Sequence, residues 1–252
     1  MIGCIIQARL GSTRLPQKVL LKLDKENSTL FYVVNQLKNS KRIDEIVVAT
    51  TDLKEDSLIE EKVKNLGIAC FKGNEKDVLD RYYNCAKEFG IDIIVRITAD
   101  CPLIDPEIVD KIIDDFDSDK EDYISNTLKK TFPKGLDIEV FTFEALKRAW
   151  TESKFPSDRE HVTNFIRNNS TFKNKNYENK ENYSEHRWTL DRKEDLEFIR
   201  EIIKRIQKRP IVMKDVISVL EQNPDLLKIN HNIDPDEGIN KSKQEDEIFG
   251  DS

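Results

Sequence analysis

Three cationic side chains and two hydroxyl groups lie close together near the start of the chain. Arg9, Arg14 and Lys18 fall within ten residues of one another, in segment 7–18, which reads Gln-Ala-Arg-Leu-Gly-Ser-Thr-Arg-Leu-Pro-Gln-Lys. The apolar run 2–6 before it is typical of a buried parallel strand. Backbone N–H groups at a strand-to-loop turn bind phosphate oxygens, and Arg and Lys add charge-assisted hydrogen bonds. The segment therefore predicts a triphosphate-binding loop, although a solvated basic turn would show the same spacing.

Two aspartates, Asp100 and Asp191, each follow a short apolar run of the kind found in strands. Mg²⁺ prefers octahedral oxygen ligands and usually takes one or two carboxylates together with substrate phosphates and water. Two carboxylates at the ends of neighbouring strands would suit that ion. Each aspartate also has a purely structural interpretation, because Asp191 is a good helix N-cap and Asp100 can stabilise the turn at Cys101 and Pro102.

The glycine pattern excludes two common nucleotide-binding motifs. None of the eight glycines forms G-x-G, so the dinucleotide fingerprint is absent. The pattern G-x-x-x-x-G-K-[ST] is absent too, because Gly11 is followed at the needed positions by Pro16, Gln17, Lys18 and Val19. Phosphates bound here would depend on arginines, a lysine and a metal ion.

The elements that must position these residues alternate between strand and helix over the first half of the chain. Apolar runs predict strands at 2–6, 43–50, 68–71 and 91–98, and helical spacing predicts helices at 30–38, 55–65, 77–89 and 106–116. This alternation predicts a parallel α/β sheet with right-handed crossovers. The polar clusters follow strands, at the edge where open α/β sheets bind ligands.

The alternation weakens after residue 120. We expect strands at 122–125, 136–141 and 187–190, helices at 143–150, 158–168, 193–207 and 213–221, and a loop at 169–184. The resulting domain covers residues 1–230, with an acceptor-side or oligomerisation excursion at about 123–186.

Composition narrows the class of protein. The net charge of −7 on 252 residues disfavours nucleic acid as a partner. Residues 231–252 carry seven acids and two lysines, a net charge of −5, and are predicted to be a disordered tail. The four cysteines lack C-x-x-C spacing, which favours buried reduced thiols. No signal-peptide pattern or membrane-length apolar run is present, so we expect a soluble cytoplasmic protein without a membrane partner.

Four blocks of sequence carry a family resemblance, with further similarity at 125–127, 135–141 and 159–163. The blocks are residues 7–18, 77–83, 95–105 and 187–196. Together they resemble the sugar-acid cytidylyltransferases, the family of the CMP-Kdo and CMP-sialic acid synthetases, and most closely its branch of SpsF-type spore coat polysaccharide biosynthesis proteins. The resemblance covers roughly residues 1–222 in the family's order.

The resemblance implies a fold, a reaction and a set of roles. The expected fold is a mostly parallel, Rossmann-like nucleotidyltransferase (GT-A-like) sheet flanked by helices, with a small α+β insertion on the acceptor side. A sugar-acid or sugar oxygen would attack the α-phosphorus of CTP and release pyrophosphate. Arg14 and Lys18 match positions that hold the triphosphate, and Asp100 and Asp191 match the carboxylates that bind the catalytic Mg²⁺. A homodimer is common in this family, although segment 169–184 is short for its usual dimerisation arm.

The remaining site residues divide into a nucleotide group and an acceptor group. The expected nucleotide-binding residues are Gln7, Ala8, Arg9, Leu10, Gly11, Ser12, Arg14, Lys18, Arg81 and Arg96. Arg81 lies in the block near the nucleobase, and its alternative role is a helix-surface arginine paired with an acid. Arg96 lies within an apolar strand and needs a partner, for which the nucleotide or Asp100 would serve.

The expected acceptor-binding residues are Lys134, Asp137, Glu139, Glu160, His161 and Arg187. A half-solvated strand would explain the alternation of polar and apolar residues at 134–139 equally well. His161 is either a catalytic base or a structural residue.

Two positions depart from the family pattern. Gln17 and Ala99 stand where the family commonly has Gly. We expect Gln17 to be tolerated if its φ angle is negative.

Other functions remain open at this stage. Within the same class, the chain could use GTP or another nucleotide, or activate a sugar 1-phosphate. From another class, it could be a non-catalytic nucleotide-binding protein on the same scaffold.

Overall fold

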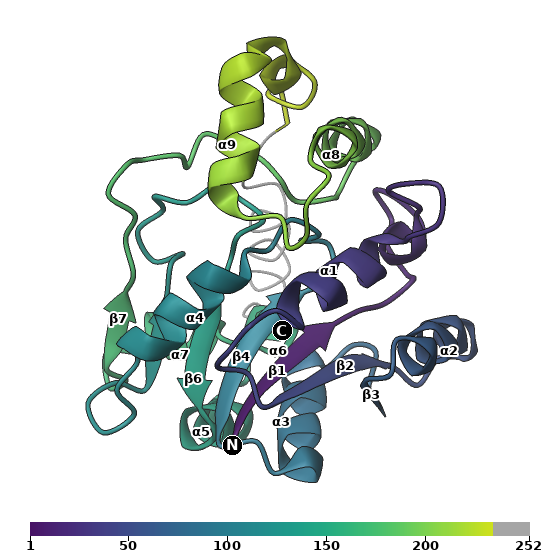
Figure 1. The fold of residues 1–252 in the computed structure, drawn as a ribbon. Helices are drawn as coiled ribbons and strands as arrows, with labels where there is room; N and C mark the ends of the chain where they lie inside the picture. Colours follow the sequence, from purple (N-terminus) through teal and green to yellow (C-terminus); the bar gives the residue numbers. More distant parts are fainter. Residues whose placement is uncertain (234–252) are drawn as a thin grey trace.

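One mixed sheet forms the centre of the molecule in this computed structural model, which describes residues 1–233. The strands are β1 Ile2–Gln7, β2 Glu45–Thr51, β3 Ala69–Gly73, β4 Ile93–Thr98, β5 Tyr123–Ser125, β6 Glu139–Thr142 and β7 Asn174–Asn176. Within the described range they form one seven-stranded sheet in the order β3-β2-β1-β4-β6-β5-β7 (Figure 1). Strands β1 to β4 are parallel, whereas β6 runs antiparallel to both of its neighbours. The predicted α/β class with a mostly parallel sheet is confirmed.

Helices cover both faces of this sheet (Figure 1). They are α1 Thr29–Leu37, α2 Ser57–Asn65, α3 Val78–Phe89, α4 Pro106–Asp115, α5 Phe143–Glu152, α6 Pro156–His161, α7 Asn164–Asn168, α8 Lys193–Arg205 and α9 Met213–Gln222, with short 3₁₀ turns η1 Lys18–Leu20, η2 Lys54–Asp56 and η3 Pro224–Lys228. Successive side chains of β4 point to opposite faces, so Val95 and Ile97 pack with α1, α4 and α8 while Ile94 packs with α3 and α5. Both faces of the central strands are therefore buried.

The predicted helix starts and stops follow from local capping. Ser28 caps α1 by accepting a hydrogen bond from the N–H of Phe31, and Asp77 caps α3 in the same way through the N–H of Asp80. Gly90 ends α3 at a φ of 63°, a left-handed conformation that glycine adopts without strain. These caps therefore fix where α1 begins and where α3 begins and ends.

The predicted strands at 136–141 and 187–190 need correction. The first begins only at Glu139, because the side-chain amide of Asn126 pairs with the backbone of Leu136 and Ile138 in place of a neighbouring strand. The second is not a strand. Trp188 donates its N–H to Lys134 O at 2.7 Å and Leu190 donates to Asp100 O at 2.8 Å, so the segment runs between two loops. Its apolar pattern reflected burial, which does not require a strand.

Two further predictions were incomplete. The helix expected at 158–168 is broken at Val162 into α6 and α7. The segment 169–184, expected to be a loop, contains strand β7, which extends the sheet beside β5.

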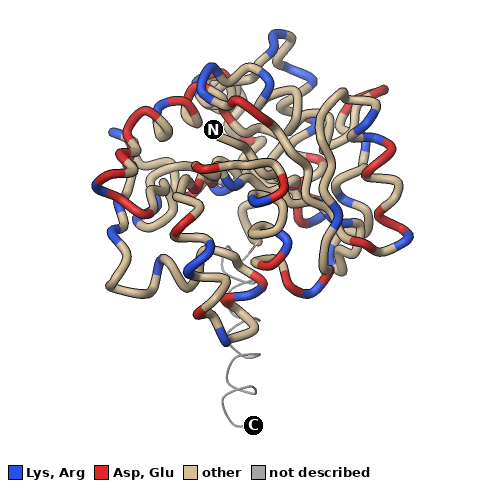
Figure 2. The backbone as a smooth tube through the Cα atoms, turned by 90° about the horizontal axis from the view of Figure 1, so that it is seen from below, with Lys and Arg blue, Asp and Glu red and all other residues tan. Residues whose placement is uncertain are grey.

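The charged residues, the cysteines and the hydropathy of the helices are distributed as follows. Figure 2 shows acidic and basic residues interspersed along the helices and loops. All four cysteines are free, and Cys4, Cys85 and Cys101 are buried. Among the described residues, no helix is long and apolar enough to cross a membrane. Most of the predicted tail at 231–252 lies outside the described residues, and the proposed domain limit at 230 stays a prediction.

Candidate active site

A cavity of about 660 Å³ opens at the carboxyl ends of β1 and β4, the edge at which the sequence predicted a ligand. Its wall combines segments that lie far apart in the chain. The predicted site residues that line it are Gln7, Ala8, Arg9, Gly11, Ser12, Arg14, Lys18, Arg81, Arg96, Asp100, Lys134, Asp137, Glu160, His161 and Asp191. The loop after β1 therefore faces both aspartates.

The loop between β1 and η1 is fixed to the protein by its apolar residues. Leu10 and Leu15 are buried, and the N–H of Leu10 donates to Asp56 Oδ1 at 2.8 Å. Gln17 closes the loop by donating its N–H to Leu10 O at 3.2 Å. Leu10 is thus an anchor beneath the loop, whereas the polar residues on either side face the cavity.

The φ angle of Gln17 is not negative, contrary to the condition under which we expected this residue to be tolerated. Its φ angle is 55°, so it adopts the left-handed conformation that the family's glycine would favour. The Gln17 side chain is exposed. The chain therefore keeps the shape of the loop at the cost of local backbone strain.

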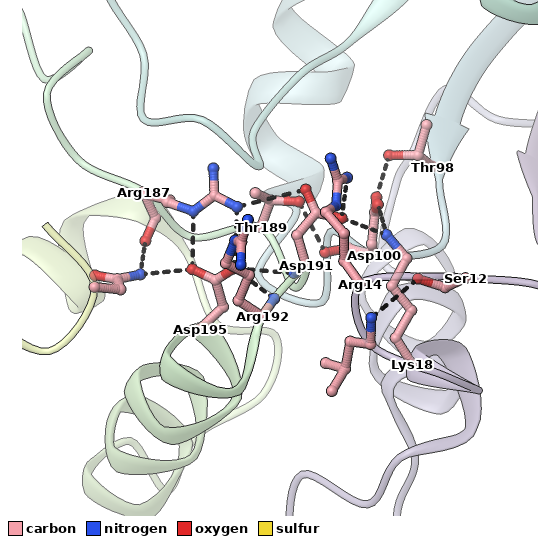
Figure 3. Close-up of polar contacts among 12 residues, drawn as sticks. Ser12, Arg14, Lys18, Thr98, Asp100, Arg187, Thr189, Asp191, Arg192 and Asp195 are labelled. Carbon is pink, nitrogen blue, oxygen red and sulfur yellow. Dashed lines mark hydrogen bonds and ion pairs between the residues drawn. The ribbon is translucent and has the colours of Figure 1, made fainter. Parts of the chain in front are cut away.

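Lys18 links the two aspartates (Figure 3). Its Nζ lies 2.5 Å from Asp100 Oδ2 and 2.6 Å from Asp191 Oδ1. A second cation, Arg14, contacts the same Asp191 oxygen from 2.9 Å. Thr98 donates its hydroxyl to the other oxygen of Asp100 at 2.6 Å. The four predicted residues therefore form one contact network, which consists of Arg14, Lys18, Asp100 and Asp191.

The network shifts the pKa values of its members. Burial alone would lower the pKa of Lys18, but Asp100 and Asp191 outweigh it and raise that pKa above its usual value. Burial opposes ionisation of Asp191, yet Lys18 and Arg14 hold its pKa well below the ordinary range. The pKa of Asp100 is lowered mainly by Lys18, against burial and the charge of Asp191. All three groups are charged at neutral pH.

Asp191 is held in place from the far side by Asp195 (Figure 3). The Asp195 carboxylate accepts the N–H of Asp191 at 2.9 Å and that of Arg192 at 3.0 Å. Arg187 binds the same carboxylate through two nitrogens, at 2.9 and 3.0 Å. The alternative role of Asp191 as a helix N-cap is therefore wrong, because Arg192 is the N-cap of α8 and Asp195 stabilises that end.

Arg96 has a different partner from the two that were expected. Its Nη1 forms an ion pair with the buried Glu139, and its Nη2 donates to Gln7 Oε1 at 2.9 Å. Glu139 also accepts hydrogen bonds from the hydroxyls of Tyr123 and Thr163, at 2.6 and 2.5 Å. Glu139 therefore lies behind the cavity wall in a charged network, and not at a surface that an acceptor would touch.

Arg81 is buried, which excludes its alternative role as a helix-surface arginine. Its side chain is 1% exposed, and Nη1 donates to the carbonyl oxygen of Asn74 at 2.6 Å. Burial lowers its pKa, and its Nε has no hydrogen-bond partner in the described structure. A buried guanidinium beside the cavity favours a ligand with hydrogen-bond acceptors.

The acceptor-side candidates occupy two places. Lys134, Asp137, Glu160 and His161 line the cavity, whereas Arg187 lines a neighbouring cavity of about 490 Å³. Asp137 keeps exposed surface at the cavity, and the protein atoms packed around it disfavour its charged form and raise its pKa to about 6, a shift that Lys134 opposes. Asp137 is therefore the carboxylate in the cavity that titrates closest to neutral pH among those with a shifted pKa.

Sequence reasoning missed several polar residues of the site. Thr13, Thr98, Cys101 and Thr189 also line the cavity, and Asp195 and Asn230 support it from behind. Thr98 and Cys101 flank Asp100 closely in the chain, so their position was the available signal. The roles of Asp195 and Asn230 depend on contacts between distant segments, for which the sequence carries no pattern.

The donor set fits a Mg²⁺ ion that arrives with phosphates. Asp100 and Asp191 supply carboxylate oxygens from two segments, and Lys18 already places a positive charge between them. Among the described residues, no group of three or more His, Cys, Asp and Glu side chains could hold a metal by itself. Two carboxylates completed by substrate phosphates and water match the usual coordination of Mg²⁺.

Comparisons with known proteins agree on one family. A family model described as cytidylyltransferase matches residues 3–229. An uncharacterized protein of Methanocaldococcus jannaschii is 41% identical over 232 residues, 91% of this chain and 94% of that protein. The spore coat polysaccharide biosynthesis protein SpsF of Bacillus subtilis is 34% identical over 235 residues, 88% of this chain and 94% of that protein. A solved cytidylyltransferase from Leptospira borgpetersenii has a TM-score of 0.88 at 36% identity, over 92% of this chain and 98% of that one.

Proposed function

The chain belongs to the cytidylyltransferase family and is a CTP-utilising nucleotidyltransferase, and from this premise we propose that it transfers CMP to a sugar acid or a related sugar. An oxygen of the acceptor attacks the α-phosphorus, the bond to the bridging oxygen of the β-phosphate breaks, and pyrophosphate leaves. The product is an activated sugar for a surface polysaccharide or another glycan. The similarity to SpsF, a spore coat polysaccharide biosynthesis protein, supports this class of acceptor.

The observation that carries this proposal is the joint contact of Arg14, Lys18, Asp100 and Asp191 on one cavity wall. Nucleotidyl transfer depends chiefly on positioning and on stabilising the charge of the phosphates. Arg14 and Lys18 provide the cations for the triphosphate and for the departing pyrophosphate. Arg81 is buried, and within residues 1–233 its guanidinium hydrogen-bonds a carbonyl oxygen and no carboxylate, which suits it to the base of the nucleotide.

We assign Asp100 and Asp191 as the residues that hold Mg²⁺. When bound, the ion would neutralise phosphate charge in the reaction. Asp195 and Arg187 orient Asp191, and Thr98 orients Asp100. Lys18 would leave the carboxylates and turn toward the phosphates when the ion and nucleotide bind.

Ligand stabilisation followed by turnover tests the proposal. Thermal unfolding is measured with CTP, GTP, UTP and ATP, each with and without Mg²⁺, and CTP with Mg²⁺ is expected to stabilise the fold most. Pyrophosphate release is then measured with CTP and a pool of sugar acids, and mass spectrometry identifies the nucleotide product. Equal lack of stabilisation by all four nucleotides would refute the enzyme assignment. Binding without any release would favour a non-catalytic nucleotide-binding protein.

The single variant Asp100→Asn tests most directly whether Asp100 takes part in turnover. We expect a folded protein, because Lys18 keeps its contact with Asp191, and a loss of turnover of at least about 10²-fold, by analogy with removal of other groups that stabilise charge in a transition state. Circular dichroism and thermal unfolding check the fold, and pyrophosphate release checks turnover. Undiminished activity would remove Asp100 from the site.

Two further expectations belong to this proposal. A cytoplasmic location would supply CTP. A homodimer stays a prediction from the family resemblance, and light scattering coupled to size-exclusion chromatography measures it.

A further inference from the structure

A strained turn separates α6 from α7 beside the cavity. Val162 has φ 62° and ψ −59°, and the N–H of Thr163 donates to the carbonyl oxygen of His161 at 2.6 Å. These angles and this bond define the rare γ-turn with positive φ. A β-branched residue is poorly suited to that region, and such strain costs on the order of 1–3 kcal/mol. Contacts of the neighbouring residues must therefore offset the free-energy cost of this conformation.

Val162 itself is one anchor. Its side chain has no exposed surface and belongs to the apolar cluster of α3 and α5. Burial of a valine side chain contributes about 1.5–3 kcal/mol, which is comparable to the cost of the strained backbone. The turn is therefore sustained by packing in the protein core.

Thr163 anchors the turn on its carboxyl-terminal side. The Thr163 hydroxyl donates to Glu139 Oε1 at 2.5 Å, and Glu139 is itself held by Arg96 and by the hydroxyl of Tyr123. Arg96 continues the network to Gln7 at the end of β1. Thr163 is therefore connected, through buried charged groups, to β1, the strand that leads into the cationic loop.

Arg159 anchors the amino-terminal side. Its Nε lies 3.0 and 2.9 Å from the two oxygens of Asp77, which caps helix α3, and its Nη1 donates to the carbonyl oxygen of Trp150 at 2.7 Å. A guanidinium that binds a carboxylate and a carbonyl together fixes both direction and distance. Helix α6 is thereby held against both α3 and α5.

Between these anchors lie Glu160 and His161, and both line the cavity. Glu160 Oε1 approaches Arg9 Nη2, on the loop after β1, to 4.0 Å. The two residues that precede the strained turn thus form the part of the cavity wall that meets the loop after β1. A carboxylate and an imidazole on a rigid wall can hydrogen-bond several hydroxyl groups of one ligand.

We propose that Arg159 and Thr163 are positioning residues that hold the strained turn at Val162, so that Glu160 and His161 form a preorganised wall for a polyhydroxylated acceptor. The identity of the ligand as the acceptor rests on the function proposed above. The positioning of His161 by the turn does not depend on that proposed function. Neither Arg159 nor Thr163 lines the cavity, so both act through the turn.

The test compares Thr163→Val, which replaces the hydroxyl by a methyl group, with Thr163→Ser, which keeps the hydroxyl and loses the methyl group. Turnover is measured with CTP and either 3-deoxy-manno-octulosonate or N-acetylneuraminate. Thr163→Val is expected to raise the acceptor KM by about tenfold, because small misplacements of binding groups have effects of this size or larger. The KM for CTP is expected to stay within about twofold, since a loss confined to one ligand's binding leaves the other unchanged. Thr163→Ser is expected to restore the wild-type acceptor KM.

A second measurement does not need turnover. The imidazole Cε1–H signal of His161 is identified in NMR spectra by its loss in His161→Gln. In Thr163→Val this signal is expected to move toward that of a mobile histidine, while the signals of His186 and His231 stay in place. Arg159→Lys, which keeps the charge and loses the forked contact, is expected to move it in the same way.

The outcomes separate this inference from the proposed function. An unchanged His161 signal in both Thr163→Val and Arg159→Lys would overturn the positioning role. A parallel rise in both KM values would overturn it as well, because it would indicate general damage to the fold. If neither sugar acid is turned over by the wild-type protein, the proposed acceptor class fails, and the NMR result still decides whether the turn is held as described.

Discussion

Lys18 occupies the position between Asp100 and Asp191 that a divalent ion would need. Its ammonium group is within 2.6 Å of both carboxylates, so in the ligand-free protein it balances two negative charges that would otherwise repel each other. A metal ion must displace this lysine before it can contact both carboxylates. In the proposed site a triphosphate would offer the displaced ammonium a new partner, so we expect nucleotide and metal to bind together.

Lys18→Met tests this exchange without any acceptor. Each charge-assisted hydrogen bond of the lysine contributes about 1.5–3 kcal/mol, so its removal is expected to tighten Mn²⁺ binding to the nucleotide-free protein by about tenfold or more. Electron paramagnetic resonance measures free Mn²⁺ in the titration. Lys22→Met changes an exposed lysine whose ammonium group donates to the nearby Lys25 carbonyl oxygen, far from the two aspartates in the contact network, and this matched control should bind Mn²⁺ like the wild type. Equal affinity in all three proteins would contradict the exchange.

Asp137 is the residue whose charge state is expected to govern the pH dependence of turnover. Its pKa of about 6 is close to neutral pH, as suits a group that accepts a proton from an acceptor hydroxyl. The base must be ionised, so kcat/KM should rise as pH increases through about 6.

Asp137→Asn is expected to lower kcat/KM by about 10²-fold or more and to remove the rise near pH 6. Pyrophosphate release measured from pH 5 to pH 8 gives the profile. A variant that keeps both the rate and the rise would show that Asp137 does not take the proton.

At the scale of elements, the amino-terminal end of α8 determines where Asp191 lies. Asp195 accepts two backbone N–H groups there and binds Arg187 and Asn230, while having no exposed surface itself. The same carboxylate therefore stabilises the helix end, neutralises a buried arginine and directs Asp191 toward the cavity. The Asp195 carboxylate therefore contributes both to the stability of the fold and to the geometry of the candidate site.

Asp195→Asn is expected to destabilise the fold by about 3 kcal/mol, because it leaves the buried guanidinium of Arg187 without its main counter-charge. Urea unfolding measures the change. The control is Asp225→Asn on η3, whose ion pair with Lys228 is exposed and is expected to contribute nothing measurable. If both variants have the same stability, the Asp195 carboxylate does not have this structural importance.

At the scale of the whole molecule, the cavity wall is assembled from the loop after β1, the end of β4, residues 134–137, the end of α6 and residues 189–191. Parallel strands bring the first two together, because their carboxyl ends share one edge of the sheet. Loop contacts bring the others, with Lys134, Trp188 and Asp100 linking adjacent segments through backbone hydrogen bonds. Residues separated by nearly two hundred positions therefore meet in one site.

The acidic end of the chain is expected to be dispensable. A chain that ends at Asn230 keeps the side-chain amide that binds Arg187 O and Asp195, and it loses a segment with a net charge of −5. Thermal unfolding and pyrophosphate release should both match those of the full chain. Complete loss of turnover on truncation would contradict this prediction and would give residues 231–252 a role in the site.

Much of the site was predictable because its signals are local. Charged residues that directly follow apolar runs, at 9–18, at 100 and at 191, predicted the cationic loop after β1 and the paired carboxylates. Helix caps and apolar periodicity predicted α1 and α3, because Ser28, Asp77 and Gly90 act on the backbone next to them. The same local logic failed at 187–190, where burial of Trp188 and Leu190 imitated a strand.

The sequence by itself therefore determined the α/β alternation, the cationic loop and the identity of the candidate metal ligands, since each depends on residues adjacent in the chain or on their periodicity. Only the tertiary structure decided which partner each charge has. Arg96 pairs with Glu139, Lys18 bridges two aspartates, and Thr163 holds the turn at Val162, because such contacts depend on how distant segments pack. A buried charge takes whichever partner the fold brings within hydrogen-bond distance, and no spacing along the chain encodes that choice.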